Sequence, residues 1–438
     1  MPSCTSGETR GEQLAPAFDV FSLFRSAIVT AFMLEYEEAV ARILAVLPRH
    51  TAETIPTTEA YGRILAEQVR SPGELPPFDN SAMDGYALRA ADVAAAKADA
   101  PVRLRLIGRA AAGESFPGEV TAGACVRLFT GSPLPRGADA VVMQEDTRIS
   151  DAGTDEVLFL DRAKPWENVR LQGEDIRKGA TLAEAGQRVT SGRLALMLAA
   201  GCSRIAVGRR PIVGLLATGN ELVEPGQPLA PGQIYECNRL MLAGLIQAVG
   251  GTPKLFPIVP DSLDATVRVF QQAFEQCDAI VSSGGVSVGE MDFVKPALER
   301  LGGKLDFWKV AIRPGRPFVF GVSAISPRGP QFLFGLPGNP VSALVTFLLL
   351  VRPALLCWQG ATEVHLPRQS GRLAEPISND GARRHFLRVQ VSADGSVRSA
   401  GVQASHVLSA VAAANALLDV PPQTTLAAGR QVETLRFE

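Results

Sequence analysis

The stretch that decides the fold is DAIVSSGGVSVGEMDFVKPALE, which runs from Asp278 to Glu299. The apolar run at residues 279–281 predicts a strand, and the serines and glycines after it predict a loop that leads into a helix. Backbone N–H groups of such a loop suit a phosphate or another oxyanion. Two carboxylates, Glu290 and Asp292, end the loop, and they repel an anion unless Mg²⁺ lies between them. The segment therefore points to chemistry on a phosphorylated or oxyanionic substrate.

Strand-like and helix-like segments alternate along residues 211–356. This pattern favours a doubly wound, mostly parallel α/β domain, in which Asn238 is expected to cap the first helix. Ligands of such sheets bind outside the carboxyl ends of the strands. The loops that begin at Thr218, Ser282 and Pro337 each follow a predicted strand, so we expect the three loops to converge on one crevice.

The segments on either side of this unit differ in pattern. Short β-like runs between Gly/Pro turns predict two further β-rich units, one before and one after the α/β domain. Two helix-like segments, at residues 33–47 and 187–200, are expected to form a separate helical layer. The expected domains are an N-terminal helical or linker domain (33–70 plus 165–208), a β-rich domain (71–164), the central α/β domain (209–357) and a C-terminal β domain (358–438).

Charge and cysteine usage exclude several classes of protein. The 438 residues carry 43 Lys plus Arg and 45 Asp plus Glu, which gives no basic surface for a nucleic acid. The six cysteines are scattered without metal-site spacing, so we expect reduced thiols in a cytoplasmic protein. The apolar run at 341–351 is too short to span a membrane before Arg352-Pro353. Residues 1–32 make a poor signal peptide and are expected to be a disordered extension or a mis-called start.

Several local patterns have two interpretations. Residues 76–86 are rich in turn-forming residues, so a plain turn and a binding loop are about equally favoured. Residues 218–221 alone favour a Gly-Asn turn with a solvated glutamate over a metal ligand. Three cations, Lys309, Arg313 and Arg316, are set among apolar residues, which favours an anion contact over a solvated charge run.

Six motifs in order resemble the molybdopterin molybdenumtransferase family, the MoeA type, which is similar to the E domain of gephyrin. The resemblance runs from about Met33 to the C-terminus. The motifs are PPFDNSAMDGYA, LQGEDIRKGATL, TGNELVEPGQPL with QIYECNRLML, SSGGVSVGEMDF, FWKVAIRPGRPFVFG and GLPGNPVSA.

The resemblance implies a reaction and a partner set. Family members take adenylylated molybdopterin and molybdate, insert molybdenum into the dithiolene and release AMP, with Mg²⁺ as the activating metal. The family fold implies four subdomains and an elongated homodimer, with Asp84 and Thr130 reaching the site of the other subunit. It further implies contacts with the adenylyltransferase and with recipient molybdoenzymes, and neither a nucleic acid nor a membrane as partner.

The site residues follow from aligning the motifs. The implied catalytic residues are Asp84, Glu221, Asp292, Lys309 and Arg313. The implied metal ligands are Glu221, Asp261 and Asp292. The implied substrate-binding residues are Thr130, Thr218, Gly284, Gly285, Ser287, Arg316, Pro337, Gly338, Asn339, Pro340, Ser342, Arg388 and Ser405.

The sequence departs from the family pattern at three site positions. Asn220 stands where the family often has Asp, and Arg313 and Arg316 stand where it commonly has Lys. Arginine keeps the charge but changes the geometry of anion binding. Two alternative functions stay open: the preceding adenylyltransferase step, which the α/β domain alone performs in related proteins, and a non-enzymatic cofactor carrier or scaffold.

Overall fold

The strand predicted at residues 279–281 lies inside the central sheet of the protein. The computed structural model describes residues 33–48, 51–149, 155–286, 292–324 and 329–438. The central sheet has the strand order β16-β13-β17-β21-β20-β18. The pairings among its first four strands are parallel, and only β20 runs against the others, so the mostly parallel α/β domain is confirmed. The strands are β13 (Ile212–Ala217), β16 (Thr252–Leu255), β17 (Ala279–Ser283), β18 (Lys304–Trp308), β20 (Val319–Ser323) and β21 (Gln331–Leu336).

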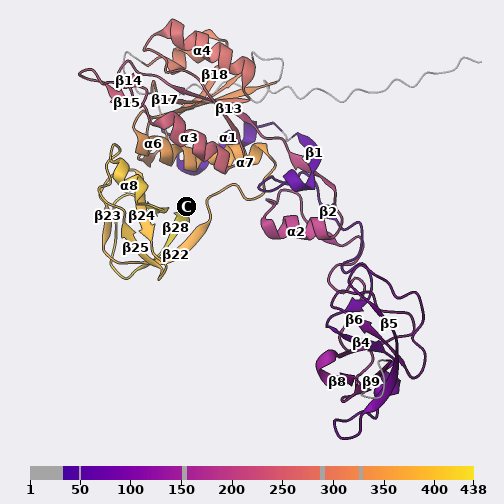
Figure 1. The fold of residues 1–438 in the computed structure, drawn as a ribbon. Helices are drawn as coiled ribbons and strands as arrows, with labels where there is room; N and C mark the ends of the chain where they lie inside the picture. The colour runs from indigo at the N-terminus through magenta and orange to yellow at the C-terminus, as the bar shows by residue number, and fades with distance from the viewer. Residues whose placement is uncertain (1–32, 49–50, 150–154, 287–291, 325–328) are drawn as a thin grey trace, which may run out of the picture.

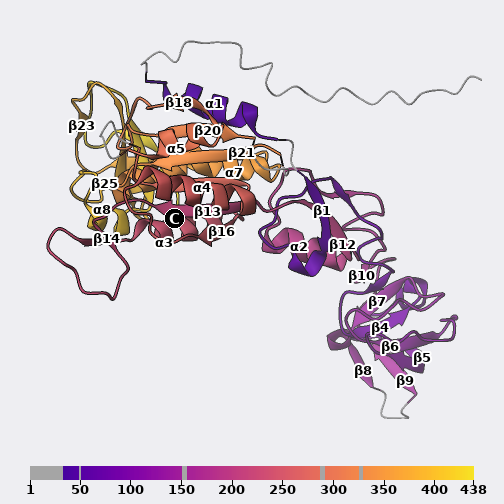
Figure 2. The same ribbon diagram turned by 90° about the horizontal axis from the view of Figure 1, so that it is seen from above.

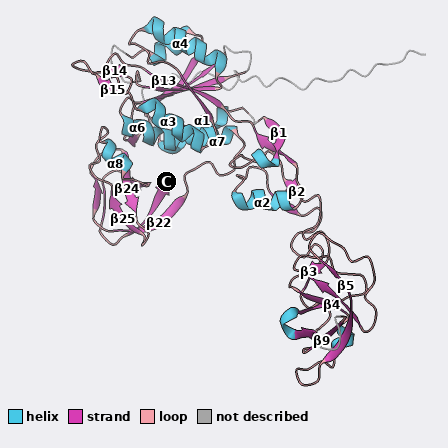
Figure 3. Cartoon of the chain, in the orientation of Figure 1, coloured by secondary structure: helices cyan, strands magenta, loops and turns pink. Residues whose placement is uncertain are grey.

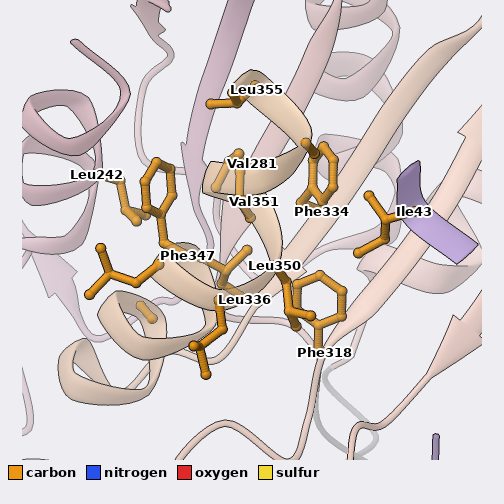
Figure 4. Packing of buried hydrophobic residues seen from close by; sticks show 14 of the residues in the cluster. Ile43, Leu242, Val281, Phe318, Phe334, Leu336, Phe347, Leu350, Val351 and Leu355 are labelled. Atoms are coloured by element: carbon orange, nitrogen blue, oxygen red, sulfur yellow. The ribbon is translucent and has the colours of Figure 1, made fainter. Parts of the chain in front are cut away.

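Helices cover both faces of this sheet, which is why every residue of β17 and β21 is buried (Figure 1). Neighbouring side chains of a strand point to opposite faces. Val281 therefore belongs to the core cluster under the long C-terminal helical run, and Ile280 belongs to the cluster under the other helices. Figure 4 shows the first of these two clusters. The helices of the domain are α3 (Asn238–Ala248), α4 (Leu263–Gln276), α5 (Val294–Arg300), α6 (Pro340–Thr346) and α7 (Arg352–Trp358).

The helix that begins at Pro340 continues further than the sequence predicts. We expected it to end before Arg352-Pro353, but a π-helical turn at Phe347–Val351 joins α6 to α7. Proline is tolerated in the first turn of a helix, where its missing N–H has no partner to lose. The run Pro340–Trp358 is long and apolar enough to cross a membrane, but 89% of its most apolar part is buried inside the protein. Its hydrophobicity is explained by its place in the core.

We expected the first helix, α1 (Tyr36–Val46), to form one layer with α2 (Ser191–Ala199), but it does not. Its buried residues belong to the core of the central domain. Backbone hydrogen bonds of Leu34 hold the start of this segment: its N–H donates to the Lys309 carbonyl (3.2 Å) and its carbonyl accepts from Ala311 (2.8 Å). An apolar helix face specifies burial but not its partner, so the sequence alone could not place α1.

The linker domain consists of α2 and two pairs of antiparallel strands around a small core (Figure 2). The pairs are β1 (Ala52–Pro56) with β12 (Arg204–Gly208), and β2 (Val69–Arg70) with β11 (Thr181–Ala183). Beyond it the chain enters and leaves the β-rich domain through β3 (Asn80–Ser81) and β10 (Val169–Arg170), which also pair antiparallel.

The β-rich domain lies at the far end of the molecule from the C-terminal domain (Figures 1 and 3). Its sheet has the order β7-β4-β6-β5-β9-β8. The strands are β4 (Gly85–Leu88), β5 (Val102–Ala110), β6 (Ala124–Leu128), β7 (Ala140–Met143), β8 (Thr147–Ile149) and β9 (Glu156–Phe159).

The C-terminal domain contains a six-stranded sheet of order β19-β24-β25-β22-β28-β26, closed by a further pairing of β24 with β26. A hairpin at residues 392–395 joins β24 to β25, with Gly395 at φ +78°. Strand β19 (Ile312–Arg313) comes from the segment before residue 358, yet Arg313 pairs into the C-terminal sheet. The other elements are β22 (Arg368–Leu373), β23 (Ile377–Asn379), β24 (Arg384–Val391), β25 (Ser396–Ser399), α8 (Leu408–Ala412), β26 (Ala416–Val420), β27 (Thr424–Leu426) and β28 (Gln431–Arg436).

The contact between the linker and central domains depends on Gly208. A Cβ atom at this position would lie 1.9 Å from the Gln359 carbonyl oxygen, which is backbone and cannot move aside alone. We expect Gly208→Ala to lower the free energy of unfolding by about 3 kcal/mol. Gly244→Ala, in the exposed middle of α3 with open space around it, should instead raise it by about 0.5–1 kcal/mol. Urea titration of both variants measures the two changes in the free energy of unfolding, which should have opposite signs. Equal changes would contradict the close packing of Gly208 against Gln359.

Candidate active site at the strand ends

A cavity of about 730 Å³ lies at the carboxyl ends of β13, β17 and β21. Loops that follow the three strands line it, so the predicted convergence of these loops is confirmed. The C-terminal domain closes one side with His406 and Leu408. The predicted site residues that line the cavity are Thr218, Glu221, Asp261, Gly284, Gly285, Asp292, Pro337, Gly338, Asn339 and Pro340. Ser287, Glu290 and residues 1–32 lie outside the described residues.

Asp292 presents a carboxylate that the described residues leave without a hydrogen-bond donor. Both of its oxygens are buried, and neither has a hydrogen-bond partner among the described residues. Burial raises its pKa from 3.8 to about 6. The hydroxyl of Thr218, which lines the same cavity, is also buried and has no partner in the described part of the chain. Such unsatisfied oxygens are costly in a fold, which favours a ligand that they complete.

The raised pKa of Asp292 predicts a pH dependence of stability. Between about pH 4 and pH 6 the folded protein holds a proton on Asp292 that the unfolded chain has released, so this residue lowers stability as the pH rises. Asp292→Asn removes that effect. The unfolding midpoint of the variant should therefore gain on that of the unsubstituted protein from pH 4 to about pH 6 and then level off. A difference that stays constant over this range in thermal melts would rule out the raised pKa.

The two other acids of the predicted metal set differ in environment. The N–H of Asn220 donates to Asp261 Oδ2 (3.0 Å), and the N–H of Asp261 donates to Asn220 Oδ1 (3.1 Å). This reciprocal pair joins the loops after β13 and β16. Glu221 lies at the start of the segment that leads to β14 (Leu222–Val223) and β15 (Ile234–Tyr235). Among the described residues, no three His, Cys, Asp or Glu side chains are grouped closely enough to hold a metal ion by themselves.

The loop after β17 approaches its neighbours so closely that glycine is required. Gly284 and Gly285 have φ values of +89° and +66°, which disfavour other residues. A Cβ at Gly284 would lie 2.8 Å from the Thr218 carbonyl oxygen. The Gly284 N–H donates to the Leu336 carbonyl (3.0 Å), which fixes the loop beside the turn after β21. The cavity wall here is bare backbone, as an anion site requires.

Asn238 has a role that the sequence did not reveal. It is the first residue of α3 rather than its cap, which is Cys237, and its side chain points across the helix start. The Asn238 Nδ2 group donates to Ser283 Oγ (2.6 Å) and to the Gly338 carbonyl (2.7 Å). An asparagine near a helix start is usually a cap, so no sequence signal separates these two roles.

Lys309 is held in a conformation that is rare for a residue with a side chain. Its φ is +86°, and its Nζ lies 4.2 Å from the centre of the Trp308 ring. The Trp308 Nε1–H donates to the Val286 carbonyl (3.3 Å), so the ring is anchored to the glycine loop. Strained backbone of this kind clusters at functional sites. These contacts support the prediction that the Lys309 ammonium group is held against the protein rather than left free in solvent.

A second group of cations lies where β19 meets β24. Arg388 is completely buried; its Nη2 donates to the Val402 and Ala404 carbonyls (3.0 and 3.2 Å), while its Nε and Nη1 have no partner among the described residues. Burial and the nearby Arg313 lower its pKa to about 10. His385, which pairs in register with Arg313, has a pKa lowered to about 4 by burial and by the surrounding arginines. A positive charge buried without a carboxylate favours a bound anion.

The C-terminal domain contacts the cavity loops through Ser405, whose hydroxyl accepts from Asn339 Nδ2 (3.2 Å).

The sequence did not indicate His385, because its environment is made by residues about seventy positions away along the chain. Ser342 is buried in α6, and Lys309, Arg313, Arg316 and Arg388 lie outside the cavity lining.

Asp84 and Thr130 form their own unit in the β-rich domain. The backbone N–H and the hydroxyl of Thr130 both donate to Asp84 Oδ1 (2.8 Å each), and these bonds lower the pKa of Asp84. The β-rich domain that carries this pair is separated from the central sheet by the linker domain (Figure 1), and neither residue lines the cavity. The two residues therefore contact each other but lie away from the cavity of the same chain.

The fold and cavity define a multidomain ligand-binding protein whose site lies at the strand ends of a doubly wound α/β domain. Three family models match the chain: the MoeA N-terminal region, domains I and II (34–201), a probable molybdopterin binding domain (214–356) and the MoeA C-terminal region, domain IV (370–437). The chain belongs to the MoeA family.

Relatives and solved structures agree with this assignment. The chain is 38% identical over 392 residues to the molybdopterin molybdenumtransferase of Haemophilus influenzae, covering 88% of this chain and 94% of the relative. It is 33% identical to the Bacillus subtilis protein of the same name, covering 91% and 93%. The crystal structure of the molybdopterin biosynthesis moeA protein from Pyrococcus horikoshii OT3 is 30% identical and superimposes with a TM-score of 0.78, covering 93% of this chain and all of that one.

Proposed function

We propose that the protein inserts molybdenum from molybdate into adenylylated molybdopterin and releases AMP. The observation that carries the proposal is the cavity in which the unsatisfied carboxylate of Asp292 faces the bare backbone of Gly284 and Gly285. The membership of the chain in the MoeA family, whose relatives are named for this transfer, supports the same reaction.

Each part of the site has a role in the proposed reaction. The glycine loop carries no side chain that would keep the adenylyl phosphate from its backbone, and Lys309 supplies positive charge for the oxygens on which charge develops. Arg313 and the uncompensated Arg388 offer the charge that a molybdate dianion would neutralise. No protein nucleophile is needed, because phosphate and metal-oxygen bonds can be exchanged by positioned ligands and water.

Asp292 fits Mg²⁺, since it supplies hard oxygen donors without partners. Magnesium is commonly held by one or two carboxylates together with substrate phosphates and water, so a larger protein cage is not required. Glu221 and Asp261 are the nearest further donors that line the cavity. When bound, the ion would polarise the phosphate as a Lewis acid.

The proposal includes a homodimer in which Asp84 and Thr130 reach the cavity of the other subunit. It is supported by the distance of this pair from the cavity of its own chain and by the exposed Phe78, Met83 and Phe129 beside it. Mixing inactive Asp84→Asn protein with inactive Asp292→Asn protein should restore about a quarter of the activity if each site draws on both chains. Molybdopterin chemistry and five free cysteines in the described residues agree with a reducing, cytoplasmic location.

The deciding experiment is molybdate-dependent release of AMP from adenylylated molybdopterin by the purified protein with Mg²⁺. Release that rises with molybdate, together with a product that activates an apo-molybdoenzyme, is the expected result. Transfer of AMP from ATP to molybdopterin would instead identify an adenylyltransferase. Binding of the adenylylated pterin without molybdate-dependent release would identify a carrier.

A further inference from the structure

We infer that Asn238 is a positioning residue that fixes the spacing between the Gly284 loop and the Gly338 turn, the two backbone walls of the cavity. The inference rests on the proposed function for its effect on substrate, but not for its effect on the loops. Asn238 is itself only 8% exposed and lines the cavity.

The geometry places one side chain between the two walls. A single Nδ2 group donates one bond to Ser283, the last residue of β17, and the other to the carbonyl of Gly338. These residues are 55 positions apart in sequence and belong to neighbouring parallel strands and the turns after them. The two bonds use both N–H donors of the amide, so the spacing of the two acceptors is tied to one planar group.

The helix that carries Asn238 is firmly anchored. Next to it, the buried Arg239 bonds Glu236 through Nε (2.9 Å), the Phe256 carbonyl through Nη1 (2.6 Å) and Glu224 through Nη2 (2.5 Å). The start of α3 is thereby fixed to the segment after β16 and to the strand pair β14–β15. Because these bonds hold the start of α3 in place, the position of the Asn238 amide sets the positions of the two walls.

The connection extends to the C-terminal domain. Asn339, next to Gly338, bonds Ser405. A shift of the Gly338 turn would therefore alter the contact through which the C-terminal domain closes the cavity. The walls that Asn238 spaces are the ones on which the adenylyl phosphate is proposed to rest, so substrate affinity should depend on a residue that need not touch the substrate.

The test compares three alanine variants. Asn238→Ala removes both bonds. Ser283→Ala removes the bond from Asn238 to β17 and the bond that Ser283 Oγ donates to the Pro337 carbonyl (3.5 Å), but it keeps the bond from Asn238 to Gly338. The matched control is Asn415→Ala, in the C-terminal domain away from the cavity. Asn415 likewise makes two backbone hydrogen bonds, donating to the Val391 carbonyl (3.0 Å) and accepting from its N–H (2.9 Å).

Hydrogen–deuterium exchange without ligand gives the first readout. Asn238→Ala should increase exchange in peptides that cover Gly284 and Gly338, whereas Ser283→Ala should do so chiefly around Gly284. Asn415→Ala should lower the unfolding midpoint without changing either peptide. If Asn238→Ala changes these peptides no more than the control does, the inference is wrong.

The affinity for adenylylated molybdopterin gives the second readout, measured well below the unfolding midpoint. The dissociation constant should rise about tenfold in Asn238→Ala and stay unchanged in Asn415→Ala, which a merely structural role would not produce. Faster exchange with an unchanged dissociation constant would overturn the positioning role. If the unsubstituted protein does not bind this substrate, the proposed function fails, while the exchange result still decides whether Asn238 spaces the walls.

Discussion

Asp292→Asn is expected to lower the rate of molybdate-dependent AMP release by roughly 10²- to 10³-fold, because it removes a cavity carboxylate whose two buried oxygens have no partner among the described residues. The substitution keeps the size of the side chain and removes its charge. Since the carboxylate is buried without compensation, the variant should be at least as stable as the unsubstituted protein at neutral pH. Steady-state kinetics with adenylylated molybdopterin measures the first effect and thermal unfolding the second.

The control is Asp264→Asn. Asp264 is an exposed acid at the start of α4 that is paired with Arg300 (2.7 Å) and does not line the cavity. Its loss should leave the rate unchanged and alter stability by less than about 1 kcal/mol. Near-normal turnover of Asp292→Asn would remove Asp292 from the mechanism, and equal losses in both variants would mean that the effect is not local.

Lys309→Met is expected to lower kcat/KM by roughly 10²-fold, because methionine keeps the apolar contact with Trp308 but loses the charge proposed to face the substrate oxygens. Stability should change little, since the half-buried cation–π contact contributes only about 1 kcal/mol. Kinetics at saturating molybdate and urea titration separate the two effects. Lys254→Met, on the exposed side of β16, is the matched control and should leave kcat/KM unchanged.

A second pair of variants tests the backbone at this position. Because Lys309 has φ +86°, Lys309→Gly should be more stable than Lys309→Ala by about 1 kcal/mol, the reverse of the usual order. Both should lack the charge and show the same loss of kcat/KM. Equal stabilities would show that the conformation of this residue is not strained.

The central domain could be predicted because its signals are local. Alternating apolar runs and turn residues define the strands, and the rule for strand ends then places Thr218, Gly284 and Pro337 around one cavity. The apolar helix that begins at Pro340 was also evident as a core element. Its continuation through Pro353 was not, because the π turn that joins the two helices depends on packing rather than on local preference.

The rest of the site depends on contacts between distant segments. Arg313 and Arg388 come together around His385 only because β24 pairs with β19, which lies about seventy residues earlier. Asn238 satisfies the local pattern of a helix cap, and its bonds to Ser283 and Gly338 exist only after the strands have assembled. The motif resemblance indicated Arg388 but not its burial. The burial of its charge is the physical reason to expect an anion beside it.

The antiparallel strands β2 and β11, which connect the linker domain to the β-rich domain, make the distal part of the molecule separable. Arg70 and Thr181 are partners in register, so the chain leaves and returns at adjacent points. Deleting residues 71–180 would leave two ends about 5 Å apart, a gap that a two-residue turn closes. Such a minimal protein would keep the cavity and lose Asp84 and Thr130, so that ligand capture by the α/β domain could be studied apart from what the distal module adds.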